Sequence, residues 1–192
     1  MAVKEIPVMA SLAALAAVTR VPLAALPGVQ PTTFFVAAAG WVMGGRAGFI
    51  VGSLAAFLSN LFLGQGPWTP WQMLAWGLVG LSAGWLGRLY REPDRFLLAI
   101  FLGLWGYLFG AIMDVWHWLT FIFPLTWTGF LATWAAGFWF DTAHAAGNIV
   151  LALAFGPGCL AIIRRFQERL RVTYEVREGV DFGEQVEGER RD

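Results

Sequence analysis

Two acidic–histidine pairs are the residues of this sequence whose types and spacing could do chemistry. They are Asp114 with His117 in "DVWH" and Asp141 with His144 in "DTAH". On a helix, a spacing of three places the carboxylate and the imidazole on a common face, and Asn148 extends the second pair by one turn. These groups suit a borderline divalent metal ion, acid–base catalysis or the wall of a site for an organic ligand. The spacing also fits a structural role, in which each Asp orients its His or caps a helix end.

The rest of the sequence narrows this choice of chemistry. A metal- or haem-binding membrane protein that uses the Asp114/His117 and Asp141/His144 pairs stays open as an alternative function. An enzyme is disfavoured because no recognisable nucleophile or oxyanion-stabilising motif accompanies the pairs. The single cysteine, Cys159, excludes an intramolecular disulfide and a multi-cysteine metal site. No Gly-Lys-Thr phosphate loop is present, so the chain cannot itself hydrolyse ATP. We therefore expect a protein that is not an enzyme, with no resident metal or cofactor and no nucleic-acid partner.

The elements that must position these pairs are predicted to be membrane helices. The 192 residues are 58% hydrophobic and 14% charged, with a mean hydropathy of +0.61, outside the usual soluble range. Apolar runs long enough to span about 30 Å of hydrocarbon recur along the chain. We predict an all-α integral membrane protein with six transmembrane helices, at about residues 6–21, 33–45, 47–63, 71–89, 96–117 and 140–166. The second and third are short for a full crossing.

The segment between the fifth and sixth predicted helices is unusual. Residues 119–139, "LTFIFPLTWTGFLATWAAGFW", are broken by Pro124 and Gly129 but are too aromatic for a solvated loop. We predict that this segment is a lid lying near the membrane interface.

Positive charges predict the orientation, because Lys and Arg near helix ends are held on the cytoplasmic side. Nearly all of those that flank the predicted helices share one side: Lys4, Arg46, Arg88, Arg91, Arg95, Arg164, Arg165, Arg169 and Arg171. Arg20 alone falls on the other side. Both termini are therefore predicted to be cytoplasmic, with a membrane-embedded domain over residues 1–172. Residues 173–192 mix charges without hydrophobic periodicity, which predicts a flexible cytoplasmic tail.

The outward side then collects polar and aromatic residues typical of a binding site. Besides the two acidic–histidine pairs and Asn148, these are Gln30, Thr32, Thr33, Asn60, Gln65, Trp68, Trp71 and Gln72. The stretch "LFLGQGPWTPWQM", residues 61–73, combines helix-breaking Pro and Gly with Gln and Trp, so it is a turn that can also contact a ligand. Trp68 and Trp71 could cover a flat apolar ligand, and Gln65 and Gln72 could supply directional hydrogen bonds.

Three stretches together resemble the S components of energy-coupling factor (ECF) transporters, the substrate-binding subunits of vitamin importers. They are "GQGPWTPWQMLAWGLVG", "DTAHAAGNIVLALAFGPG" and "PTTFFVAAAGWVMGGRAGFIVGSLAAFLSNLFLGQGPW", and the resemblance covers about residues 6–166. It implies a multi-pass protein of the prokaryotic cell membrane that works with a coupling transmembrane subunit and two ATPase subunits. It also implies that "GQGPWTP" is an extracellular connection able to close over the ligand. Family substrates include riboflavin, thiamine, biotin, folate and cobalamin, and likeness to cobalamin-type members favours a bulky ligand of that kind.

The alanine-rich first predicted helix carries the family's expected docking surface. In that family an Ala-x-x-x-Ala pattern packs against the coupling subunit, and small residues four apart allow such close approach in lipid. Ala10 with Ala14 and Ala13 with Ala17 both fit the pattern, and the sequence alone leaves the register open.

Overall fold

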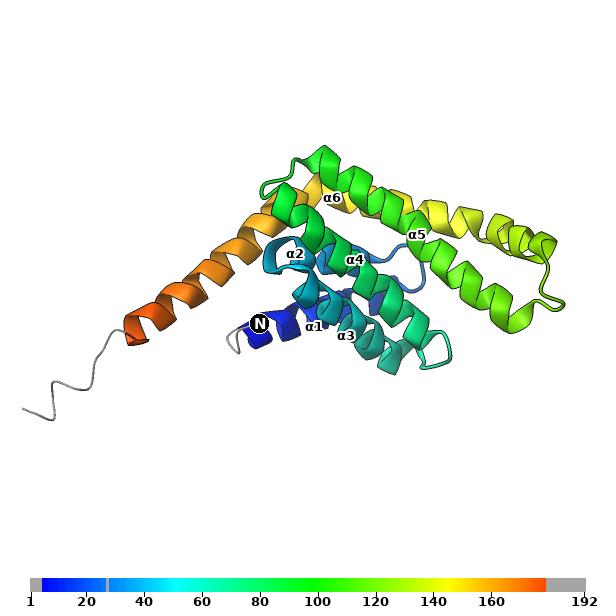
Figure 1. Ribbon diagram of the computed structural model, residues 1–192, viewed down its shortest axis with the longest axis horizontal. Coiled ribbons are helices and arrows are strands. Elements are labelled where there is room, and N and C mark those ends of the chain that lie inside the picture. The colour runs from blue at the N-terminus through cyan, green and yellow to red at the C-terminus, as the bar shows by residue number, and fades with distance from the viewer. Residues whose placement is uncertain (1–4, 27, 179–192) are drawn as a thin grey trace, which may run out of the picture.

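The structure is a bundle of α-helices (Figure 1). The computed structural model describes residues 5–26 and 28–178, with side chains as far as residue 169. Its six helices are α1 (Ile6–Leu23), α2 (Pro31–Met43), α3 (Gly45–Leu63), α4 (Thr69–Leu89), α5 (Arg95–Phe121) and α6 (Trp127–Glu178). These ranges contain no strand, so the predicted all-α class is confirmed for them. The α6 backbone continues past the predicted domain boundary at residue 172, and residues 179–192 of the predicted tail lie outside the described part of the chain.

Proline and glycine set the ends of the first four helices. Pro7, Pro31 and Pro70 occupy the first turns of α1, α2 and α4, where a missing backbone N–H breaks no helical hydrogen bond. Gly44 and Gly64 follow α2 and α3 with φ of 94° and 105°. Side chains other than glycine rarely adopt this conformation, so these two positions allow the chain to leave each helix sharply.

Among the described residues, four helices are long and apolar enough to cross a membrane: α1, α3, α5 and α6. The 13-residue α2 is apolar but shorter, as predicted. The prediction that the third helix is short for a crossing was wrong, because α3 has 19 residues. It begins at Gly45, directly after the reversal at Gly44 and two residues before the predicted start.

The predicted lid over residues 119–139 was wrong. Helix α5 continues to Phe121, α6 begins at Trp127, and only a short turn that contains Pro124 separates them. Pro124 lies between helices rather than inside one, and Gly129 is tolerated within α6. The two helices pack chiefly against each other and form a long antiparallel hairpin, which extends beyond α1–α4 in Figure 1.

Close backbone contact between small residues holds α2, α3 and α4 together. Gly40 of α2, Gly48 of α3 and Gly80 of α4 meet at one point, where a Cβ on any of them would collide with the backbone of a neighbouring helix. Gly84 makes a similar contact with Gly45. Because lipid offers no hydrophobic drive for helix association, such close packing is a main source of stability in a membrane bundle.

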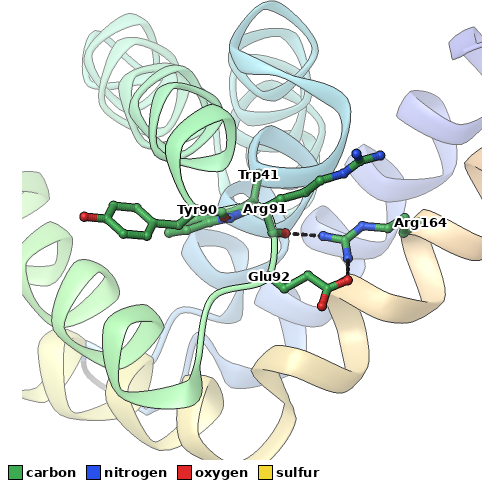
Figure 2. Close-up of polar contacts among 5 residues, drawn as sticks. All are labelled: Trp41, Tyr90, Arg91, Glu92 and Arg164. Atoms are coloured by element: carbon green, nitrogen blue, oxygen red, sulfur yellow. Dashed lines mark hydrogen bonds and ion pairs between the residues drawn. The ribbon is translucent and has the colours of Figure 1, made fainter.

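The connections fall at two opposite ends of the bundle. In Figure 1 the start of α1 and the end of α6 lie at one end, and the α3–α4 and α5–α6 connections lie at the other. At the first end, Arg164 of α6 contacts the α4–α5 connection (Figure 2). It forms an ion pair with Glu92 at 3.1 Å and donates a hydrogen bond to the backbone carbonyl of Arg91. The Trp41 indole of α2 donates to the carbonyl of Tyr90 at 2.8 Å, so three elements are joined there.

Candidate functional site

Five buried polar residues join the ends of α1, α3 and α4, and we call them the polar cluster. Arg20 Nη1 donates to Ser59 Oγ and to Asn60 Oδ1, each at 2.7 Å. Asn60 Nδ2 donates in turn to Thr69 Oγ1 at 3.0 Å and to Gln72 Oε1 at 2.8 Å. All five are buried. Because Asn60 lies near the end of α3 and Thr69 begins α4, the polar cluster lies directly beside the α3–α4 connection.

Trp76 links the polar cluster to α2 and α6. The Arg20 guanidinium carbon lies 4.8 Å from the centre of the Trp76 ring. The indole N–H of Trp76 donates to Thr33 Oγ1 at 3.0 Å, and the same hydroxyl is 2.8 Å from His144 Nε2. An indole can only donate, so the Thr33 oxygen accepts from Trp76 and its hydrogen is free to point to His144 Nε2. The Thr33 hydroxyl therefore connects the Trp76 indole to the His144 ring.

The structure places Asp141, His144 and Asn148 on the buried face of α6, as their spacing predicts. Asp141 is 3% exposed and His144 1% exposed. Their expected mutual hydrogen bond is absent, because His144 bonds to Thr33 while its Nδ1 and Asp141 Oδ2 have no hydrogen-bond partner. Asn148 donates to the carbonyl of Leu102 on α5, and its own Oδ1 has no partner. Buried polar atoms without partners are uncommon, so this face can accept further hydrogen bonds.

The carboxylates of the α5–α6 hairpin pack against glycines of the facing helix. Asp141 of α6 lies against Gly110 of α5, and Asp114 of α5 lies against Gly137 of α6. Asp114 makes no hydrogen bond to His117, and His117 is exposed beside Phe121. Within the described residues no three His, Cys, Asp or Glu side chains come close enough to hold a metal ion. The geometry therefore adds nothing to the metal or haem alternative.

The α3–α4 connection is ordered by its own polar groups. Gln65 Nε2 donates to the Phe57 carbonyl at 2.9 Å, and the Thr69 hydroxyl donates to Gln65 Oε1 at 2.9 Å. Trp68 packs edge-on against Trp116 of α5, with ring centroids 6.1 Å apart. The connection therefore rests on the hairpin and closes the bundle above the polar cluster.

Residues 4–155 match the family described as the ECF transporter substrate-specific component. This match covers most of the chain. The chain belongs to that family. No curated protein and no solved structure shows a significant match to it. Members of the family are substrate-binding transporter subunits rather than enzymes, and the apolar helices agree with a membrane protein of this kind.

In this substrate-specific component, several of the residues selected from the sequence come together. Asn60 and Gln72 belong to the polar cluster, and Thr33 and His144 are joined to it through Trp76. Gln65 adjoins it through Thr69.

Other selected residues lie apart or have different partners. Thr32 donates to the Ala16 carbonyl and so braces α2 against α1, and Gln30 Oε1 is buried without a partner. Trp71 is half-buried at the start of α4. Asp114 and His117 lie in the hairpin, and no described hydrogen bond connects them to the polar cluster.

Arg20, Ser59, Thr69 and Trp76 are the members of the network that the sequence-based selection missed. Arg20 carried a signal, since it is the sole basic residue predicted on the outward side and stands inside an apolar helix. A charge in such a position is a candidate functional residue. Ser59 and Trp76 carried no comparable signal, because a serine within an apolar run is uncharged and Trp76 is one of eleven tryptophans in the chain.

The two alanine pairs of α1 lie in different environments. Ala13 and Ala17 are 1% and 4% exposed and pack inside the bundle. Ala10 and Ala14 are exposed. On the same helix Ser11 and Leu15 line an apolar groove of about 770 Å³ between α1 and α6. Only the Ala10/Ala14 pair is therefore accessible to another helix.

Proposed function

We propose that this chain captures a vitamin or related micronutrient from outside the cell, for ATP-driven uptake through an ECF coupling subunit and two ATPase subunits. The observation that carries the proposal is the polar cluster of a family member, buried beside the one connection that combines Trp, Gln and Pro. Polar groups concentrated at one end of an apolar bundle are typical of a binding site rather than of a purely structural core.

The α3–α4 connection acts in this proposal as the lid. The polar cluster is nearly closed to solvent, so a ligand that reaches it from outside has to displace this connection. Trp68 rests on Trp116 through one edge contact and is half-buried, which is a weaker attachment than the glycine packing below it. Opening at this point leaves the helix bundle intact.

Cobalamin or a similarly bulky ring-bearing compound is the favoured ligand. The support is the breadth of the aromatic surface at the lid end, where Trp68, Trp116 and Phe121 are joined by successive ring contacts. Aromatic side chains supply a large apolar contact area with defined geometry, which suits a ligand with a wide ring system.

Docking of the coupling subunit is assigned to Ala10 and Ala14. They are the accessible pair, and small side chains let a partner helix approach closely. Replacing both with Leu should reduce co-purification of co-expressed coupling and ATPase subunits. The matched control replaces the exposed Val18 of the same helix with Leu, which changes bulk only slightly. Unchanged co-purification of the Ala10/Ala14 variant would contradict this docking surface.

The test of the capture function is the identity of the bound compound. The full chain is purified in detergent from cells grown in rich medium, and the extract is analysed by mass spectrometry for organic ligands and for metals. A stoichiometric vitamin-like compound whose binding resists a strong chelator is expected. Stoichiometric metal that a strong chelator removes, or haem identified by its mass, would support the Asp–His alternative instead.

A further inference from the structure

Arg20 is a buried cation that the described part of the chain does not neutralise. Its hydrogen bonds go to a hydroxyl and an amide oxygen, both uncharged, and its ring contact is with Trp76. No carboxylate among the described residues lies within ion-pair distance of it. Arginine keeps its charge in proteins, and a charge in a membrane domain is costly without a partner. Arg20 is only 9% exposed, so it has little contact with bulk water.

The hydrogen bonds of Arg20 leave one edge of its guanidinium available. Both hydrogens of Nη1 are used, one by Ser59 and one by Asn60. Nε and Nη2 have no described partner. Their two parallel N–H groups form the fork that matches the two oxygens of a carboxylate or phosphate group. A neutral side chain such as Gln could brace α1 against α3 through the same two acceptors, so the brace alone does not account for the charge.

We infer that Arg20 binds an oxyanion of the ligand, either a carboxylate or a phosphate ester. This inference rests on the proposed function and narrows the ligand to a micronutrient that carries an acidic group. Asn60 and Ser59 hold the guanidinium in place, and Trp76 covers one of its faces. The ligand oxyanion therefore meets a cation whose position is already fixed, which reduces the entropy lost on binding. The rest of the ligand extends toward Trp68 and the lid.

The test compares acidic ligands with neutral counterparts. The full chain is placed in nanodiscs of zwitterionic lipid, and binding is titrated by calorimetry. The carboxylate pairs are nicotinate with nicotinamide and biotin with its amide. The phosphate pairs are riboflavin 5′-phosphate with riboflavin and cobalamin with cobinamide, which lacks the nucleotide loop that carries the phosphodiester. Wild-type protein should bind the acidic member of at least one pair roughly 10- to 100-fold more tightly, the range for a hydrogen bond to a charged group. A preference within a carboxylate pair identifies a carboxylate as the group bound by Arg20, and a preference within a phosphate pair identifies a phosphate ester.

Variants separate recognition from bracing. Arg20→Gln should bring the acidic-to-neutral affinity ratio close to 1, whereas Arg20→Lys should retain part of it because the charge remains. Arg46→Gln removes an exposed arginine and is the control, with the ratio unchanged. If Arg20→Gln does not fold, the wild-type ratio and the Lys variant still decide the question.

The failure of this inference is distinguishable from the failure of the proposed function. Wild-type protein that binds a micronutrient without preferring the acidic member overturns the role of Arg20 and leaves the capture function standing. If Arg20→Gln lowers the affinity for the acidic and the neutral ligand by the same factor, the role of Arg20 is likewise overturned and the capture function stands. An extract without any organic ligand, together with no binding across all pairs, overturns both.

Discussion

Arg20 and Arg164 are both held by hydrogen bonds between helices, but their charges are balanced differently. Arg164 lies at the end that holds the α4–α5 connection, where its side chain is 21% exposed and that of its partner Glu92 is 84% exposed (Figure 2). Arg20 lies beside the α3–α4 connection, is 9% exposed and has only neutral partners. The charge of Arg164 is therefore balanced within the chain. Arg20 keeps an unbalanced charge and two N–H groups that have no described partner.

The difference shows how to separate structural from functional cations in this bundle. An exposed ion pair contributes only about 0.2–1 kcal/mol, because water screens both charges. A buried guanidinium loses more hydration, and only strong partners offset the free energy lost in this way. The ion pair of Arg164 with Glu92 therefore contributes little free energy, whereas the unpaired charge of Arg20 carries the larger electrostatic cost. Four sets of substitutions, taken from the largest expected effect to the smallest, test this contrast.

Breaking the packing that both ends share should have the largest effect. Gly80→Leu places a branched side chain against the backbones of Gly40 and Gly48. Overpacking typically costs about 1–3 kcal/mol and occasionally more, and here the collision is with backbone atoms that cannot rotate away. We expect loss of the monodisperse folded protein, measured by size-exclusion chromatography in detergent. Gly158→Leu is the control, since nothing lies within 4 Å of a Cβ at that position. Equal behaviour of the two variants would contradict the described helix contacts.

Removing the centre of the polar cluster should have the next largest effect. Asn60→Ala takes one acceptor from Arg20 and the donor from both Thr69 and Gln72, which leaves buried polar groups unpaired at a cost of about 2 kcal/mol. Thermal unfolding in detergent measures the loss.

The matched control is Ser53→Ala, which removes a single neutral hydrogen bond from Ser53 to the Met73 carbonyl between the same two helices. It should cost about 1 kcal/mol or less. A smaller loss of stability for Asn60→Ala than for Ser53→Ala would contradict the role of Asn60 in pairing the buried groups of the polar cluster.

Weakening the lid should change ligand affinity more than stability. Trp68→Ala removes the edge contact with Trp116, and aromatic contacts contribute about 0.5–1.5 kcal/mol beyond burial, or several-fold in affinity. Trp71→Ala, at the start of α4, should act in the same direction. Gln72→Ala should also lower ligand affinity, but it should lower stability too because Gln72 accepts a hydrogen bond inside the polar cluster. Calorimetric titration of the compound identified in the extract measures the effect, with the exposed Trp85→Ala on α4 as control. Titration curves that match the wild-type curve for all three variants would contradict the role of the α3–α4 connection as a lid.

Breaking the ion pair at the opposite end should have the smallest effect. Glu92→Gln should lower the free energy of unfolding by less than about 1 kcal/mol, because Glu92 is largely exposed and Arg164 keeps its bond to the Arg91 carbonyl. The difference from wild type should shrink further in high salt. Thermal unfolding at low and high salt checks both points, and ligand affinity should not change. A larger loss here than in Asn60→Ala would reverse the contrast between the two ends.

The sequence predicted local features well where a single helix decides them. All six predicted helices exist, and the predicted stripe of Asp141, His144 and Asn148 is buried on one face, because helical periodicity fixes which residues share a side. The predicted lid over residues 119–139 was wrong because Pro124 does not break the whole segment. Its effect is confined to a short turn, and packing between α5 and α6 keeps the flanking residues helical.

What the sequence determined by itself is the membrane class, the helix order, an arginine inside the apolar first helix and two equivalent alanine registers on that helix. These follow from composition and periodicity, which are properties of neighbouring residues. Only the tertiary structure decided that Ala10 and Ala14 remain exposed, that His144 bonds to Thr33 instead of Asp141, and that Arg20 meets Asn60. Each of these depends on how α1, α2, α3 and α6 are rotated against one another. That rotation is set by close glycine and alanine contacts between segments far apart in the chain, and no local pattern encodes it.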